Sequence, residues 1–182
     1  MAATAKKPSF MTARGTASYP YLQPGRPDTQ FDSEGVYKVQ LMVDADDAKP
    51  MVDQLRSIAN DEFGKDAKGA NMPFKVDEET KKVIFTCKSK WPAKFVDASG
   101  KFIPEAAVPA IFGGSTLKCA GKVSAYSIGS RIGLSLALNA VQIVDLAEQT
   151  GGVNFDAEED GGFHFEAVND NEPAANGQSY DF

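Results

Sequence analysis

The segment Val36-Tyr-Lys-Val-Gln-Leu-Met-Val43 is the clearest strand in the sequence. Apolar side chains occupy every second position, and Lys38 and Gln40 lie between them. A two-residue period of this kind predicts a strand with one face toward a core and the other toward solvent. The predicted buried face consists of Tyr37, Val39, Leu41 and Val43.

The period changes immediately after this strand. Apolar residues recur at helical spacing, which predicts one helix from about Ala48 to Phe63, with Asp46-Asp47 offering its N-cap and Gly64 following its end. Alternation indicates four further strands, with a bulge in the last one before Ile143. Their approximate ranges are Ser9–Ala17, Lys82–Trp91, Leu117–Tyr126 and Arg131–Leu146.

Five strands and one inserted helix predict an all-β fold in the form of a small closed barrel. The OB-fold, a five-stranded barrel, is the leading member of that class. Sustained periodicity ends near Gly151-Gly152. We therefore predict two parts: an OB-fold domain over residues 1–147, and a disordered acidic C-terminal tail over residues 148–182.

Charge is distributed unevenly along the chain. All 19 Lys and Arg residues lie at or before Arg131, whereas 10 of the 25 acids lie after it. The first part is therefore mildly basic and the remainder strongly acidic. This pattern is typical of a polyanion-binding body with a tail that imitates its ligand. Five aromatic residues in the tail favour partner docking over a merely solubilising role: Phe155, Phe163, Phe165, Tyr180 and Phe182.

Lysines and aromatic residues alternate between faces on two of the predicted strands. In the strand Lys82–Trp91, alternation places Lys82, Lys88 and Lys90 on the same face. In the strand Leu117–Tyr126, it places Lys118, Lys122 and Tyr126 on the same face. Ammonium groups neutralise phosphates, and aromatic rings stack on unpaired bases. The alternative is that outward lysines only keep a sheet soluble and its edges unpaired. The candidate binding residues are Lys82, Lys88, Lys90, Lys118, Lys122, Tyr126 and Arg131, and the sequence leaves open whether Phe85, Trp91 and Phe95 are core or stacking residues.

Catalytic and metal-binding patterns are missing from the sequence. The one histidine, His164, lies in the predicted tail, without a rigid scaffold for a catalytic triad. Cys87, Cys119 and His164 lack the paired spacing of zinc sites, and we predict that both cysteines are free thiols. We expect no enzyme activity, no cofactor and no metal. The longest apolar stretch, 132–144, is too short to span a membrane, and a signal-peptide core is lacking, which predicts a cytoplasmic protein.

Several short segments, taken in order, resemble the replication single-stranded DNA-binding proteins of podovirus-type bacteriophages. They are Gly15-Thr16-Ala17, Gly35-Val-Tyr-Lys-Val39, Met72-Pro-Phe74 and Val108-Pro-Ala-Ile-Phe-Gly-Gly-Ser-Thr-Leu-Lys118, followed by a long aliphatic strand and an acidic tail ending in Asp181-Phe182. The resemblance spans nearly the whole chain. Two features depart from it: the acids of the tail are scattered, and the region 127–131 lacks a tryptophan and a lysine.

This resemblance implies an OB-fold that binds single-stranded DNA during phage DNA replication, recombination and repair, and that helps complementary strands anneal. It implies Tyr126 as the base-stacking residue and Phe182, with Asp181, as the docking site for phage DNA polymerase and helicase-primase. It places the protein in the cytoplasm of an infected bacterium and allows a homodimer.

We therefore expect a sequence-independent single-stranded DNA-binding protein whose acidic tail docks replication partners and restrains DNA binding. Two alternatives stay open. One is an RNA-binding OB module, although nothing in the sequence is suited to a 2′-hydroxyl. The other is a structural or scaffolding protein that binds no nucleic acid.

Overall fold

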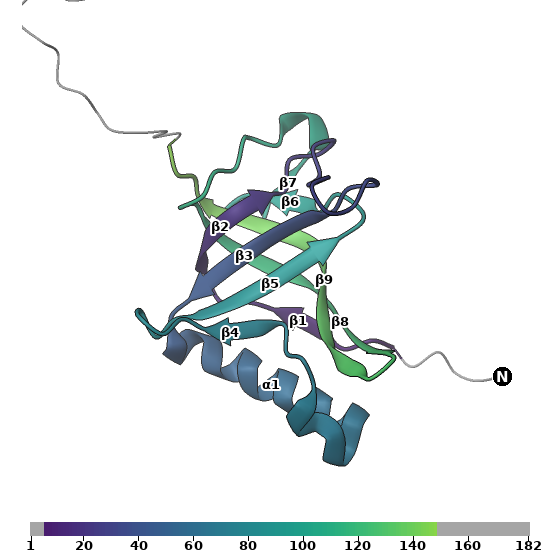
Figure 1. Ribbon diagram of the computed structural model, residues 1–182. Coiled ribbons are helices and arrows are strands. Elements are labelled where there is room, and N and C mark those ends of the chain that lie inside the picture. The colour runs from purple at the N-terminus through teal and green to yellow at the C-terminus, as the bar shows by residue number, and fades with distance from the viewer. Residues whose placement is uncertain (1–5, 149–182) are drawn as a thin grey trace, which may run out of the picture. The chain divides into compact units, whose positions relative to one another are not determined.

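The computed structural model describes residues 6–148 as a β-barrel with one long helix at one end (Figure 1). The strands are β1 (Ser9–Met11), β2 (Gly15–Tyr21), β3 (Tyr37–Val43), β4 (Phe74–Val76), β5 (Val83–Ser89), β6 (Lys94–Val96), β7 (Phe102–Ile103), β8 (Thr116–Ile128) and β9 (Arg131–Asp145). The helices are α1 (Ala45–Phe63) and two short 3₁₀ segments, η1 (Gly64–Gly69) and η2 (Glu105–Ala107). The predicted tail lies outside the described residues, apart from Glu148.

Five strands close into a ring in the order β8-β2-β3-β5-β9, and β9 returns to pair with β8. Every pairing in the ring is antiparallel except β5 with β9, which is parallel. A ring closed in this way removes the free edges that an open sheet exposes. The expected five-stranded OB-fold with one inserted helix is confirmed.

Smaller elements extend the ring where loops were expected. The predicted first strand is interrupted, because β1 pairs with one part of β8 and β2 with another. The region after α1 contains η1 and β4, and β4 adds to the edge of β5. The region between β5 and β8 contains the β6–β7 hairpin, and β6 pairs with β9. Two- or three-residue strands show too little alternation to be recognised from sequence.

Helix α1 begins three residues earlier than predicted, at Ala45. Its N-cap is Asp44, which makes no side-chain capping bond, so the predicted N-cap at Asp46-Asp47 is wrong. These two acids lie in the first turn instead, where their negative charges interact favourably with the positive end of the helix dipole. Gly64 ends the helix with a positive φ of 55°, as expected. In the described part of the chain, no helix is long and apolar enough to cross a membrane.

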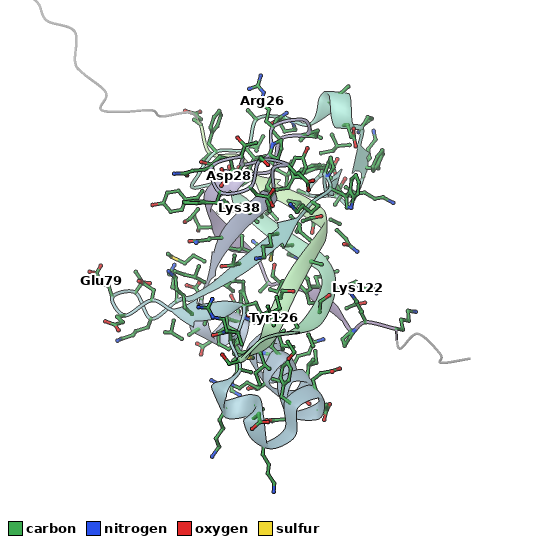
Figure 2. All side chains as sticks on the ribbon, turned by 45° about the vertical axis from the view of Figure 1, so that its right-hand side comes forward. Arg26, Asp28, Lys38, Glu79, Lys122 and Tyr126 are labelled. Carbon is green, nitrogen blue, oxygen red and sulfur yellow. The ribbon has the colours of Figure 1, made fainter. Side chains whose placement is uncertain are left out.

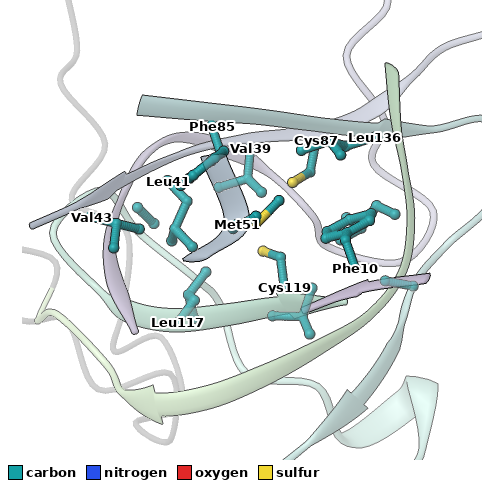
Figure 3. Close-up of a cluster of buried hydrophobic side chains, with 14 of the residues drawn as sticks. Phe10, Val39, Leu41, Val43, Met51, Phe85, Cys87, Leu117, Cys119 and Leu136 are labelled. Atoms are coloured by element: carbon teal, nitrogen blue, oxygen red, sulfur yellow. The ribbon is translucent and has the colours of Figure 1, made fainter. Parts of the chain in front are cut away.

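The core fills the inside of the barrel and extends to the buried face of α1 (Figure 3). The predicted inward face of β3 is fully buried, and Phe85 of β5 and Met51 and Leu55 of α1 pack into the same cluster. Cys87 and Cys119 are both buried as free thiols, which confirms that prediction. A hydrogen bond between the thiols, together with burial, raises the pKa of Cys87 well above its usual value.

The predicted bulge in β9 is confirmed. Ala120 of β8 pairs with Ala140, but the next residue, Gly121, pairs with Leu138, so Asn139 is the extra residue. A bulge bends the strand that contains it and increases the local twist. The two longest strands, β8 and β9, can therefore curve around the barrel and close it.

Candidate nucleic-acid interface

The outer faces of β3 and β5 form the centre of the candidate site. In β5, Phe85 and Cys87 point into the core, whereas Thr86 and Lys88 lie on the outer face, as alternation predicts. Lys88 lies directly opposite Lys38 of β3 in the antiparallel ladder. Two ammonium groups on adjacent strands therefore share one outer surface.

A row of outward residues crosses the barrel through these two lysines. On one side, Tyr21 of β2 is the register partner of Lys38. On the other side, Ala137 of β9 pairs with Lys88 in the parallel ladder and with Lys122 in the antiparallel ladder. Ala137, a small residue, lines a hollow together with Lys88.

Three hollows lie on this part of the surface, and Lys88 lines all of them; together we call them the Lys88 groove. The first has a volume of about 400 Å³ and extends to Tyr126. The second, also of about 400 Å³, extends to Tyr21 and Lys38. The third, of about 340 Å³, extends to Lys90. Figure 2 shows Lys38 and Tyr126 toward opposite ends of the barrel.

Gly133 provides the space that the ring of Tyr126 occupies. The two residues are partners in the β8–β9 ladder. A Cβ atom on Gly133 would lie 2.5 Å from the Tyr126 hydroxyl oxygen and 2.6 Å from the backbone oxygen of Asn71. The ring therefore lies across β9 over a position where only glycine fits, and Tyr126 also lines the first hollow.

Acids of the β2–β3 loop (residues 22–36) reach back to one end of the groove. Asp28 forms an ion pair with Lys38 and accepts a hydrogen bond from the backbone N–H of Gln30 at 2.9 Å. The hydrogen bond from the Lys38 ammonium, assisted by that from Gln30, lowers the pKa of Asp28. Lys38 thus lines the groove while its charge is already partly neutralised by the Asp28 carboxylate.

The same loop holds Lys90, just beyond the end of β5. Lys90 pairs with Asp32 and lies 3.7 Å from a carboxylate oxygen of Glu34. The hydrogen bond between Lys90 and Asp32 lowers the pKa of the Asp32 carboxyl and raises the pKa of the ammonium. Lys90 therefore binds the loop as well as lining the third hollow.

Ordered contacts fix the conformation of this loop. Asp28 and Val36 form a bridge, with backbone hydrogen bonds of 2.9 Å in both directions. The backbone N–H of Gly25 donates to the Tyr37 hydroxyl at 3.1 Å. Gly35 has a φ of 81°, which favours glycine, and a Cβ there would collide with the ring of Pro27. The ordered backbone of the loop therefore holds Asp28 and Asp32 close to the lysines with which they pair.

The other predicted lysines lie away from the groove. Lys82 pairs with Asp44 at 3.1 Å, beside the start of α1. Lys118 lines a separate, mostly apolar hollow of about 260 Å³ with Met11. Lys122 donates to the Ser9 hydroxyl of β1 at 2.7 Å. Of the predicted residues, the structure brings Lys88, Lys90 and Tyr126 into the Lys88 groove.

The remaining candidates divide between surface, core and tail. Arg131 is exposed at the start of β9, just after the β8–β9 turn. Phe85 and Phe95 are core residues, whereas Trp91 is 77% exposed. Asp181 and Phe182 lie outside the described residues. Within residues 6–148, no cluster of His, Cys, Asp and Glu side chains is arranged to hold a metal ion.

Sequence reasoning missed part of the groove wall, namely Lys38, Tyr19 and Tyr21. The outward phase of Lys38 was visible in the strand pattern, but its pairing with Lys88 is a long-range contact. The two tyrosines belong to an irregular part of β2, where the register shifts between Ser18 and Tyr21. Alternation gives no indication of such a shift.

The groove occupies the surface that OB-folds use for oligonucleotides. That surface is the face of the second and third barrel strands, bordered by the loop between the first two strands and the loop between the last two. In this chain the strands are β3 and β5, and the loops are residues 22–36 and the β8–β9 turn. Similar OB surfaces also accept oligosaccharides, so the side chains must decide between ligands.

Comparison with solved structures identifies the fold relatives. Gp2.5, a single-stranded DNA-binding protein encoded by bacteriophage T7, superimposes with a TM-score of 0.68 at 26% sequence identity, covering 87% of this chain and 100% of its own. The single-stranded DNA-binding protein of bacteriophage Enc34 gives a TM-score of 0.62 at 14% identity, covering 81% and 87%. This chain has the fold of phage single-stranded DNA-binding proteins.

The resemblance drawn from the sequence is thereby confirmed. The structure of the Enc34 protein in complex with single-stranded DNA also matches, with a TM-score of 0.62 and 14% identity over 79% of this chain and 89% of that one. These relatives are binding proteins, in agreement with the expectation that the chain is not an enzyme. No family model and no curated protein matches this chain.

Proposed function

We propose that this chain is a sequence-independent single-stranded DNA-binding protein of phage DNA replication, recombination and repair. The observation that carries the proposal is the Lys88 groove. The ammonium of Lys88 lies between its two ends. One end contains the aromatic residue Tyr126, and the other contains Tyr21 and Lys38. Cations at intervals neutralise a phosphate backbone, and rings with an accessible face stack on bases of any identity. The likeness to gp2.5 of phage T7 supports the same conclusion.

An oligonucleotide titration tests this function. Trp91 is the one tryptophan of the chain, is largely exposed and follows β5 by two residues, so its fluorescence is a natural reporter. We expect single-stranded DNA to bind more tightly than double-stranded DNA of the same sequence, with similar affinity for different sequences. Equal or tighter binding of matched RNA would instead favour the RNA-binding alternative. A lack of binding to any oligonucleotide would favour the scaffolding alternative.

We also propose that the acidic segment of residues 148–182 competes with DNA for the basic body. The segment contains acids and no Lys or Arg, whereas the part up to Arg131 contains every cation of the chain. Removing residues 148–182 should raise DNA affinity, most strongly at low salt, where charge screening is weakest. Unchanged or weaker binding by the truncated chain would contradict the competition.

The final residues supply a further proposal about partners. Asp181 and Phe182 combine negative charge with an aromatic side chain, which suits docking to phage DNA polymerase and helicase-primase. Deleting Phe182 should leave DNA affinity unchanged and abolish co-precipitation of the polymerase. Recovery of polymerase by the shortened chain would contradict this role. We further propose that the protein helps complementary strands anneal and that it forms a homodimer. Its proposed location is the cytoplasm of the infected bacterium.

A further inference from the structure

Three aromatic side chains at one end of the Lys88 groove are exposed to solvent. Tyr19 is 74% exposed, Tyr21 is 40% exposed, and Phe31 of the β2–β3 loop is 87% exposed. Large aromatic side chains contribute most to stability when they are buried. A group of exposed rings beside a hollow therefore marks a surface that is used for binding.

The backbone of β2 is irregular in a way that turns two of these rings outward. Gly15 and Ala17 face the core, so strict alternation would also place Tyr19 and Tyr21 inside the barrel. Between Ser18 and Tyr21 one extra residue is inserted relative to β3, and Tyr19 adopts a positive φ of 47°. A bulge of this kind redirects side chains, and a strained non-glycine residue is commonly found at a binding site. Both tyrosines consequently line the second hollow.

Lys38 connects these rings to the cationic centre of the groove. Its ammonium lies 5.3 Å from the centre of the Tyr21 ring and 6.0 Å from that of Phe31. At these distances a cation is attracted to the face of an aromatic ring, which holds Lys38 close to the rings. The second hollow thus combines the two groups that a nucleotide requires, a surface for the base and a cation for the phosphate.

The register shows that this end of the groove is distinct from the Tyr126 end. Tyr21, Lys38 and Lys88 lie on three successive strands, and two more strand steps lead through β9 to β8. Four steps of about 4.8 Å amount to about 19 Å along the surface, and Tyr126 lies four residues further along β8 than Lys122. One base cannot contact both ends. A strand that does so must contain several nucleotides, within the range of about 4–16 per OB-fold.

We propose that Tyr19, Tyr21 and Phe31 form a second base-stacking subsite, separated from Tyr126 by Lys38 and Lys88, and that a single DNA strand engages both. This inference rests on the proposed function and extends it. The strand crosses the groove from β2 over β3 and β5 to the β8–β9 turn, with its phosphates near Lys38 and Lys88 and its bases on the rings at either end.

A length series of oligothymidylates tests the second subsite. The full chain and its Tyr19→Ala/Tyr21→Ala variant are titrated with oligomers from two to twelve nucleotides. In the unaltered chain, affinity should increase sharply once the oligomer is long enough to reach both ends. In the variant this increase should disappear, with a loss of about 5- to 150-fold for each stacked base at the longer lengths. Tyr21→Phe keeps a stacking ring and should retain most of the affinity.

Two control variants separate the outcomes. Phe102→Ala removes an exposed ring, 59% accessible, from β7, which is not part of the groove, and should leave affinity unchanged. Phe31→Ala alters only a loop side chain. It should weaken the binding of long oligomers, and it provides this test even if a tyrosine variant is unstable. Normal binding by Phe31→Ala and by a folded tyrosine variant, together with a loss in Tyr126→Ala, would refute the second subsite and preserve the proposed function. Failure of the unaltered chain to bind at any length would refute both.

Discussion

Lys38 and Lys88 lie directly opposite each other across β3 and β5, but only Lys38 has a carboxylate partner among the described residues, Asp28. Like charges at opposite positions of an antiparallel pair destabilise a sheet. The ion pair with Asp28 reduces this repulsion and leaves Lys88 as the cation at the centre of the groove. The arrangement makes Lys88 available for a phosphate without leaving two unneutralised ammonium groups side by side.

Replacing Lys88 should separate DNA binding from stability. We expect Lys88→Ala to weaken single-stranded DNA binding and to reduce the dependence of log affinity on log salt concentration by about 0.7, the value for one phosphate contact on a single strand. The free energy of unfolding should stay unchanged or rise, because the repulsion with Lys38 is lost. Titrations at several salt concentrations and thermal melts measure the two effects. Lys49→Ala is the matched control, because Lys49 lies on α1 and pairs with Asp53. The role of Lys88 is refuted if both variants bind DNA alike.

Asp32 should act as a competitor for the phosphate at Lys90. Asp32→Asn removes the carboxylate that pairs with Lys90 in the third hollow, and we expect single-stranded DNA affinity at low salt to increase by up to about fivefold, as suits an exposed ion pair. Asp53→Asn removes an acid from α1 and serves as the control. Weaker binding by Asp32→Asn would mean that the loop conformation matters more than its charge.

Gly133 should be required for the position of Tyr126. In Gly133→Ala the new methyl group would overlap the Tyr126 ring and the Asn71 carbonyl oxygen, so the ring must move away from β9. We expect DNA affinity to fall about as far as in Tyr126→Ala, and the double variant to be little weaker than either single one, since both changes affect one stacking contact. Gly129→Ala, in the adjacent turn, has open space around its side chain but strains a positive φ of 59°, and so tests for general effects of disturbing this hairpin. Additive losses in the double variant would contradict this coupling.

The outward faces of β5 and β8 could be predicted from the sequence, because alternation is a local property of a strand. Which outward residues meet could not. Lys118 and Tyr126 share a face of β8 but are eight residues apart, or about 27 Å along a strand. Over that length a strand on a curved barrel passes from one side of the molecule to another. Lys118 therefore lies beside Met11 in a separate hollow, whereas Tyr126 lies beside Lys88.

The β2 end of the groove was unpredictable for a different reason. The bulge between Ser18 and Tyr21 shifts the two-residue period, so the alternation of Gly15 and Ala17, if continued along β2, would place Tyr19 and Tyr21 on the wrong face. The Lys38–Lys88 pair depends on a contact between strands separated by α1. Its counter-charge, Asp28, comes from a loop whose position depends on Gly35 and Tyr37. Each of these is a tertiary feature with no local signal.

Acidification should weaken the fold partly through Asp28. The pKa of this carboxyl is lowered by its hydrogen bonds with Lys38 and Gln30, so it contributes stability above its unfolded pKa of about 3.9, and that stability is lost as the pH falls through the lower folded value. Asp28→Asn cannot ionise and lacks this contribution at every pH. Chemical denaturation of both proteins between pH 6 and pH 2.5 should therefore show a stability difference that is largest near neutrality and shrinks below about pH 4. Asp46→Asn, at an acid without an ion pair among the described residues, should follow the unaltered protein more closely. A difference for Asp28→Asn that stays constant over the whole range would show that the side chain stabilises the loop without its charge.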